Sequence, residues 1–192
     1  MEKFFEQMSE MVDATQRSAA ERALSPRDFM QLAADEVDRS SRYDRPLAVA
    51  MVSVDGLAVL RKVDGAERAE QIMDHMFHHL GMLVRGPDRI ARIGQAELGV
   101  MMPETTLKNA AMVAERMREG LQSESGAVIG VKHQLGLSVG VAALSPRVRD
   151  PKRFLMTACF ELRRAQSEGG DQVCVASADT VRLSIPRSGQ IH

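Results

Sequence analysis

The stretch RIGQAELGVMMP, residues 92–103, decides how this chain is expected to fold. We expect one strand over Asp88–Ile93 and a second over Leu98–Met102, because both runs are of strand length. The segment Gly94–Glu97 between them carries the glycine that a tight turn favours. The sequence therefore predicts a β-hairpin, exposed at one end of a sheet.

The segments on either side of the hairpin alternate between helical and strand patterns. Apolar residues recur at helical spacing in four segments, Pro26–Arg42, Ala66–Val84, Thr105–Gln122 and Pro151–Ser167. Short apolar runs predict three further strands, over Leu47–Val54, Gln134–Ala143 and Gln172–Ala176. Strands mixed with crossover helices predict an α/β (α+β) domain with a central sheet and helices on its faces.

The two ends of the chain are expected to lie outside this domain. Apolar residues at helical spacing predict an extra helix over Glu2–Leu24. That helix either packs on its own domain or serves in dimerisation or docking, and the sequence leaves both readings open. We divide the chain into an N-terminal helix at 1–24, a domain at 25–178 and a flexible tail at 179–192.

Composition limits the partners of the protein. Lys and Arg total 25 while Asp and Glu total 26, so a broad surface for nucleic acid or an anionic membrane is not expected. The longest nearly apolar run, Pro46–Val54, is too short to span a membrane, and no secretory signal is recognisable. Cys159 and Cys174 are too few for a disulfide framework or a four-cysteine zinc site. A cytoplasmic protein is expected.

Several segments resemble GGDEF domains, the diguanylate cyclases. The hairpin is similar to the family motif R-Y-G-G-D/E-E-F, which apolar residues and Pro follow. AERMR at 114–118 resembles the A-E-R-I-R helix, and LSVGVA at 137–142 resembles the S-I-G-V-A strand. Pro46–Asp55 and Gly65–Met73 resemble two further family segments. The resemblance spans Ser25 to Ala176. It implies a bacterial second-messenger protein of nucleotide-cyclase fold, with a five-stranded sheet flanked by helices.

The metal-binding positions of the family are where this sequence departs from it. The first metal Asp falls at Ser53 and the hairpin's metal carboxylate at Ala96, so that Glu97 and the neighbouring Asp55 remain. The chemistry requires carboxylates because hard oxygen ligands hold the Mg²⁺ that neutralises charge on the transferring phosphoryl group. We therefore expect no bound metal, no cofactor and no diguanylate cyclase activity.

The nucleotide contacts implied by the resemblance are also altered. The guanine-reading Asn falls at Arg61, and the next acidic guanine contact is Glu70 in place of Asp. The triphosphate Lys falls at Gln166, and the second hairpin glycine is Gln95, whose side chain would intrude on the phosphates. The degenerate active-site positions are, in chain order, Ser53, Arg61, Glu70, Gly94, Gln95, Ala96, Glu97, Leu98 and Gln166.

A second constellation of the family is retained. Active members often carry an inhibitory product site, R-x-x-D, separated from the hairpin motif by five residues, and Arg85-Gly86-Pro87-Asp88 has this spacing. A further family arginine falls at Arg116. Arginine matches guanine O6 and N7 with its planar fork, and aspartate accepts from guanine N–H groups. The alternative is a surface ion pair that closes a helix.

These observations favour a receptor over an enzyme. We expect a catalytically inactive GGDEF domain that binds cyclic di-GMP at Arg85, Asp88 and Arg116, with the ligand as an intercalated dimer. An unidentified effector protein or a second copy of the chain would then receive the signal. The alternatives are a nucleotide-free interaction scaffold and, less favoured, a GTP-binding pseudo-cyclase that uses Arg61, Glu70 and Glu97.

Overall fold

A computed structural model describes residues 24–125, 135–146 and 148–177. In chain order its elements are α2 (Pro26–Tyr43), β1 (Leu47–Asp55), α3 (Leu57–Val63), α4 (Ala66–Leu83), β2 (Arg89–Arg92), β3 (Glu97–Pro103), α5 (Leu107–Ser125), β4 (Gly136–Ala143), α6 (Pro151–Ser167) and β5 (Val173–Val175). The helix predicted at 2–24 and the tail predicted at 179–192 lie outside the described residues, except for Leu24. The division into domains therefore stays a prediction.

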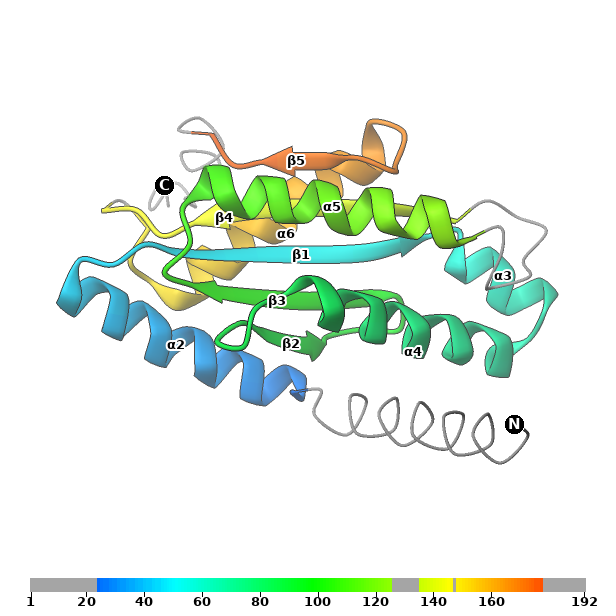
Figure 1. Ribbon diagram of the computed structural model, residues 1–192, viewed down its shortest axis with the longest axis horizontal. Coiled ribbons are helices and arrows are strands. Elements are labelled where there is room, and N and C mark those ends of the chain that lie inside the picture. The colour runs from blue at the N-terminus through cyan, green and yellow to red at the C-terminus, as the bar shows by residue number, and fades with distance from the viewer. Residues whose placement is uncertain (1–23, 126–134, 147, 178–192) are drawn as a thin grey trace, which may run out of the picture.

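The five strands form one mixed sheet in the order β2-β3-β1-β4-β5 (Figure 1). Strand β1 lies at the centre and pairs antiparallel with both β3 and β4, whereas β5 pairs parallel with β4. Every residue of β1 except Asp55 is buried, as the continuous apolar run predicted for a strand covered on both faces. The predicted α/β fold with a five-stranded sheet is confirmed.

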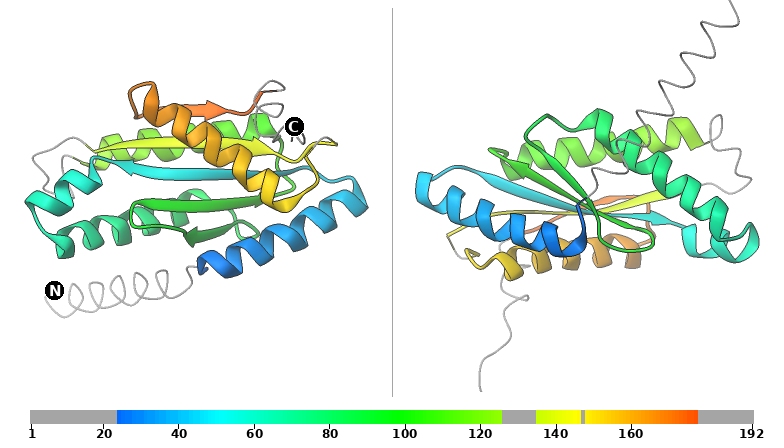
Figure 2. Two further views of the ribbon diagram at one scale, coloured as in Figure 1. Left: turned by 180° about the vertical axis from the view of Figure 1, so that it is seen from behind. Right: turned by 90° about the horizontal axis from the view of Figure 1, so that it is seen from below.

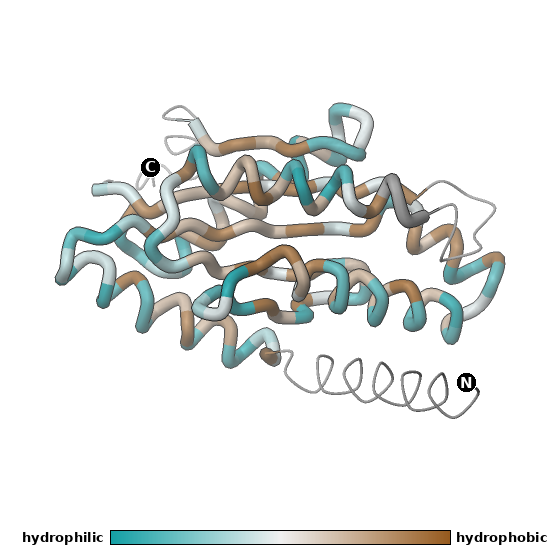
Figure 3. Tube along the Cα trace, in the orientation of Figure 1, coloured by the Kyte–Doolittle hydropathy of each residue, from teal (hydrophilic) through white to brown (hydrophobic). Residues whose placement is uncertain are grey.

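Helices cover both faces of the sheet. Helices α4 and α5 lie over the face seen in Figure 1, and α2 and α6 lie over the opposite face (Figure 2). Side chains alternate along β1, so that Ala48, Ala50 and Val52 pack under α4 and α5. Leu47 and Val49 pack instead under α2 and α6. Figure 3 shows that much of the length of the central strands is hydrophobic, in agreement with their burial between the two layers of helices.

The helix boundaries follow local sequence signals. Ser25 caps α2, because its hydroxyl accepts a hydrogen bond from the backbone N–H of Asp28, and Pro26 occupies the first turn. Asp150 caps α6 in the same way by accepting from the N–H of Arg153. Thr106 caps α5, since its hydroxyl accepts from the N–H of Asn109. These helix starts were predicted from the sequence, and they are confirmed within two residues.

Helix α3 is missing from the order of elements predicted from the sequence, and that order is wrong at this point. It has seven residues, which is too short for a helical period to be recognised. It begins after Gly56, whose φ of 80° is a conformation that favours glycine. Leu57 and Leu60 bury its inner side against the sheet and α4, so packing rather than sequence pattern defines this helix.

Helix α6 lies unusually close to the sheet at Gly140 of β4. A Cβ at that position would overlap the backbone of α6 at Ala158 and Leu162. Glycine is therefore required there by close approach, and α6 is held in direct contact with β4. This contact brings Gln166, near the end of α6, within reach of β1.

None of the described helices is both long enough and apolar enough to cross a membrane.

Candidate functional site

Ser53 lies near the carboxyl end of β1, between Glu97 of β3 and Ser138 of β4. It is buried, with 4% of its surface exposed. Its hydroxyl accepts a hydrogen bond of 3.1 Å from the side-chain amide of Gln166 on α6. Two positions at which the resemblance implies a metal carboxylate and a triphosphate lysine therefore hold a neutral, mutually bonded pair. A hydroxyl and an amide give Mg²⁺ none of the negative charge that carboxylates supply.

Asp55 is engaged in holding the sheet together. Its Oδ2 accepts a hydrogen bond of 2.7 Å from the hydroxyl of Ser138 and one of 2.8 Å from the backbone N–H of Asp171. Asp171 in turn accepts from the N–H of Leu137 through Oδ1. The carboxylate thus ties β1 to β4 and to the turn before β5. Sequence reasoning counted Asp55 among the remaining metal carboxylates and missed this structural role.

The turn of the hairpin is folded around the side chain of Glu97. The carbonyl of Glu97 accepts from the N–H groups of Ile93 and Gly94, and its Oε2 accepts from the N–H of Ala96 at 3.2 Å. A Cβ at Gly94 would overlap this carboxylate, so a larger residue there would displace the side chain of Glu97 from the turn. Gln95 is exposed, whereas Leu98 is buried in β3. The hairpin carboxylate therefore lies back against its own turn.

Glu70 is held between two arginines. Its Oε1 lies 2.6 Å from Nη2 of Arg61, and its Oε2 lies 2.6 Å from Nη2 of Arg92. Although desolvation by burial acts in the opposite direction, hydrogen bonds from Arg92 and Arg61 and their positive charges lower the pKa of Glu70. The two positions that the resemblance assigns to guanine are thus paired with each other. Arg92 belongs to the quoted hairpin stretch, but its part in this cluster was not recognised from the sequence.

The described residues offer no arrangement that suits a metal. No group of three or more His, Cys, Asp or Glu side chains in this part of the chain is placed to hold an ion. The donors at the carboxyl end of β1 are a hydroxyl, an amide and two carboxylates that already accept hydrogen bonds from the protein. This donor set does not fit the Mg²⁺ that a triphosphate reaction needs.

The structure brings Arg85 and Asp88 together in a closed turn between α4 and β2. Asp88 accepts a hydrogen bond of 2.8 Å from the backbone N–H of Arg85, and its Oδ1 lies 3.3 Å from Nη2 of Arg85. The same Nη2 donates to the carbonyl of Pro103 at 3.1 Å and to the hydroxyl of Thr105 at 2.6 Å. Thr105 and Pro103 were not among the predicted site residues, because nothing in their sequence marks them.

The two side chains of this turn differ in exposure. The side chain of Asp88 is only 3% exposed, whereas that of Arg85 is 56% exposed. The buried carboxylate of Asp88 therefore holds the guanidinium of Arg85 in place, and part of that guanidinium faces solvent. The direct contact with guanine predicted from the sequence for Asp88 stays a prediction. In this structure the carboxylate of Asp88 accepts from the backbone and the guanidinium of Arg85.

Arg116 is exposed on α5, the helix beside α4 on the same face of the sheet (Figure 1). Within the described residues it makes no hydrogen bond or ion pair, and so none with Arg85 or Asp88. Arg118 on the same helix differs, because it pairs with Glu115 at 2.9 Å and with Asp171 at 3.5 Å. Of these two arginines of α5, the one singled out from the sequence is thus the one whose guanidinium is not engaged by the described residues.

The sheet order, the two helical layers and the hairpin define a domain of the nucleotide-cyclase type. Residues 24–172 match the family model described as "Diguanylate cyclase, GGDEF domain". The match covers well over half of the chain, and the chain belongs to the GGDEF family.

Curated relatives include proteins named as diguanylate cyclases. The chain is 26% identical over 143 residues to the "Probable diguanylate cyclase DgcC" of Escherichia coli, a match that covers 74% of this chain and 38% of DgcC. It is 22% identical over 140 residues to "Diguanylate cyclase A" of Treponema denticola, covering 73% of this chain and 38% of that protein. The matched region is less than two fifths of the length of these relatives.

Solved structures support the fold. The active GGEEF domain of a diguanylate cyclase from Vibrio cholerae superposes with a TM-score of 0.74 at 16% identity, covering 81% of this chain and 98% of that domain. The GGDEF domain of DgcB from Caulobacter crescentus, solved in complex with c-di-GMP, gives 0.72 at 15% identity, covering 80% and 91%. At such identities the likeness establishes the shared fold.

Proposed function

We propose that this chain is a catalytically inactive GGDEF domain that binds cyclic di-GMP at the Arg85–Asp88 turn and signals through contacts with another protein. The observation that carries the proposal is that the polar side chains at the former catalytic end are paired with one another, whereas an arginine at the Arg85–Asp88 turn is accessible. At the former catalytic end, Ser53 bonds to Gln166 and Glu70 bonds to Arg61. At the Arg85–Asp88 turn, an exposed guanidinium is held in place and stays accessible.

The inactivity follows from the chemistry of phosphoryl transfer. A cyclase must hold a metal ion on a triphosphate, and the charge on that metal must be balanced by carboxylates. Ser53 and Ala96 supply none, while Asp55 already accepts from Ser138 and from the backbone of Asp171. Any nucleotide that entered would also have to break the pair of Glu70 with Arg61 and Arg92 before its base met either group.

The receptor role follows from the chemistry of the turn. Arginine can form two parallel hydrogen bonds with guanine O6 and N7, or with a phosphate. Asp88 and Thr105 hold the Arg85 guanidinium through Nη2, and Asp88 also accepts from Nε at 3.5 Å. Nη1 is left to meet a ligand, and little conformational entropy is lost when the ligand binds. Arg116 adds a second guanidinium on the same layer of helices. A stacked dinucleotide dimer has a second face, and arginines of a second copy or the surface of an effector protein would meet it there.

The test is a titration of the full chain with cyclic di-GMP, followed by calorimetry and by measurement of molecular mass. We expect saturable binding to the wild type. Arg85→Ala should weaken it by about 1–3 kcal/mol, because the arginine contact with the ligand is lost. Lys108→Ala is the control, because it removes an exposed positive charge from α5 and should leave binding unchanged. Equal binding by wild type and Arg85→Ala would contradict the site, and no binding at all would favour the nucleotide-free scaffold.

A further inference from the structure

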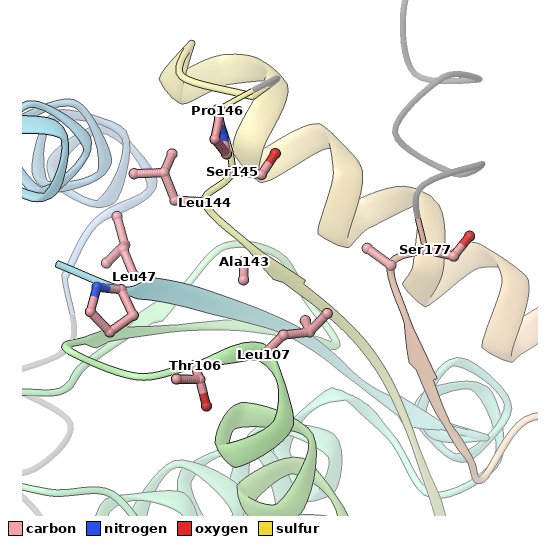
Figure 4. A pocket seen from close by; sticks show the side chains of 10 residues that line it. Leu47, Thr106, Leu107, Ala143, Leu144, Ser145, Pro146 and Ser177 are labelled. Atoms are coloured by element: carbon pink, nitrogen blue, oxygen red, sulfur yellow. The ribbon is translucent and has the colours of Figure 1, made fainter. Parts of the chain in front are cut away.

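A cavity of about 550 Å³ opens at the end of the sheet opposite the hairpin turn (Figure 4). It is formed where β1 begins, where β4 and β5 end and where α5 begins. Its lining residues are Pro46, Leu47, Thr106, Leu107, Ala143, Leu144, Ser145, Pro146, Ala176 and Ser177. None of them belongs to the catalytic positions or to the Arg85–Asp88 turn.

Among the described residues, the lining is apolar and carries no charged side chain. Its polar side chains are the hydroxyls of Thr106, Ser145 and Ser177, and the hydroxyl of Thr106 already accepts from the backbone of Asn109 as the cap of α5. A nucleotide or another anion would find no cationic partner among these lining residues. The cavity therefore suits aliphatic side chains, whose transfer from water into an apolar site is favourable by virtue of the area removed from solvent.

The chain itself carries a matching segment directly beside the cavity. Ser177, one of the lining residues, is the last described residue before 178–192. In that segment Val181, Leu183 and Ile185 alternate with Arg182 and Ser184. Alternate side chains of an extended segment point to the same side, so the three aliphatic residues can face one surface together. Three residues separate Ser177 from Val181, and an extended chain covers about 3.3–3.6 Å per residue.

We propose that Val181, Leu183 and Ile185 of this chain dock in the cavity. Their attachment at its rim makes docking intramolecular, and a short linker gives an effective concentration on the order of millimolar. A free apolar molecule or a second copy of the chain must compete with that concentration. The proposal replaces the flexible tail expected from the sequence with a segment that is anchored by its aliphatic side chains.

The experiment uses the full chain with and without a disabled segment. Leu183→Asp places a charge in the middle of the aliphatic set, whereas Arg182→Ala changes the opposite side of the segment and is the matched control. The probe is a fluorescent peptide with the sequence of residues 178–192, and its binding is followed by fluorescence anisotropy. Circular dichroism and thermal unfolding verify that both variants are folded.

We expect the peptide to bind the Leu183→Asp chain at least tenfold more tightly than the wild type or Arg182→Ala, because the tethered segment occupies the cavity in both of these. Ala143→Met, added to Leu183→Asp to fill the cavity, should abolish this binding. Equal affinity for wild type and Leu183→Asp, or no binding to either at millimolar peptide, would overturn the proposal. If the affinity of the peptide for the wild type decreased as the protein concentration was raised, a second copy of the chain would be the occupant, and this result would also overturn the proposal.

Discussion

Two regions of this domain hold arginines beside carboxylates, and they use them differently. At the former catalytic end, Glu70 is clamped between Arg61 and Arg92, so its carboxylate and both guanidiniums are engaged with one another within the protein. At the turn between α4 and β2, Asp88 is buried beneath Arg85, and the guanidinium above it stays exposed. In the first arrangement the ion pairs occupy both the carboxylate and the guanidiniums, which leaves neither for a ligand. In the second arrangement the buried carboxylate orients an arginine that a ligand can still reach.

The largest effect is expected at the closed end, from Ser53→Asp. The new carboxylate would be buried in the sheet beside Glu97, with the neutral Gln166 as its neighbour on α6. An uncompensated buried charge should lower the free energy of unfolding by about 3 kcal/mol or more. Urea denaturation measures the loss. Ser53→Ala is the control, because it removes only the hydrogen bond with Gln166, worth about 1 kcal/mol.

Magnesium makes this variant informative about catalysis. If millimolar Mg²⁺ returned Ser53→Asp to wild-type stability, the carboxyl end of β1 would still be a metal site awaiting a single ligand. We expect no such recovery, because Ala96 supplies no second carboxylate and Asp55 is already bonded to Ser138.

The next effect is expected at the open turn, from Asp88→Asn. This change keeps the shape of the side chain and removes its charge, so the buried group holds Arg85 less firmly. We expect the free energy of unfolding to fall by about 1–2 kcal/mol, as for a weakened charge-assisted hydrogen bond. The affinity for cyclic di-GMP should fall together with stability, since the guanidinium must then be ordered by the ligand. Unchanged affinity in calorimetry would show that Asp88 does not position Arg85.

A smaller and cleaner effect is expected from Arg116→Ala. Arg116 has no partner within the described part of its own domain, so its removal should leave thermal unfolding within about 0.5 kcal/mol of the wild type. Binding of cyclic di-GMP should weaken by about 1 kcal/mol or more, because a direct ligand contact is lost. Arg118→Ala provides the comparison, because it breaks pairs with Glu115 and Asp171 and should affect stability rather than affinity.

The smallest effect is expected from Glu70→Gln. The folded-state pKa of Glu70 is lowered, so the carboxylate stabilises the fold above its unfolded value of about 4.5, and this contribution is lost as the pH falls through the folded value. Because Glu70 is 43% exposed and solvent screens the pair, the contribution at neutral pH should be below about 1 kcal/mol. Denaturant midpoints of wild type and variant should differ at pH 7 and converge near pH 3. A constant difference across that range would show that the pair does not act through charge.

The sequence predicted the fold better than the engagement of the site. Apolar runs and cap residues such as Ser25 report local structure, so the strands and the longer helices could be placed from them. Helix α3 could not, because its seven residues are defined by packing against the sheet. The cluster of Arg61, Glu70 and Arg92 joins three separate elements, and no local pattern reveals such a meeting. The burial of Asp88 beneath Arg85 was also outside what R-x-x-D spacing can show.

The comparison between the closed and the open region is tested most directly by hydrogen exchange of the wild-type chain, measured with cyclic di-GMP and, separately, with GTP and Mg²⁺. We expect cyclic di-GMP to slow exchange at residues 84–89 and 112–118, and GTP with Mg²⁺ to change nothing at residues 53–61 or 93–97. Protection of the hairpin and of the end of β1 by GTP, with none around Arg85 from the dinucleotide, would contradict the account.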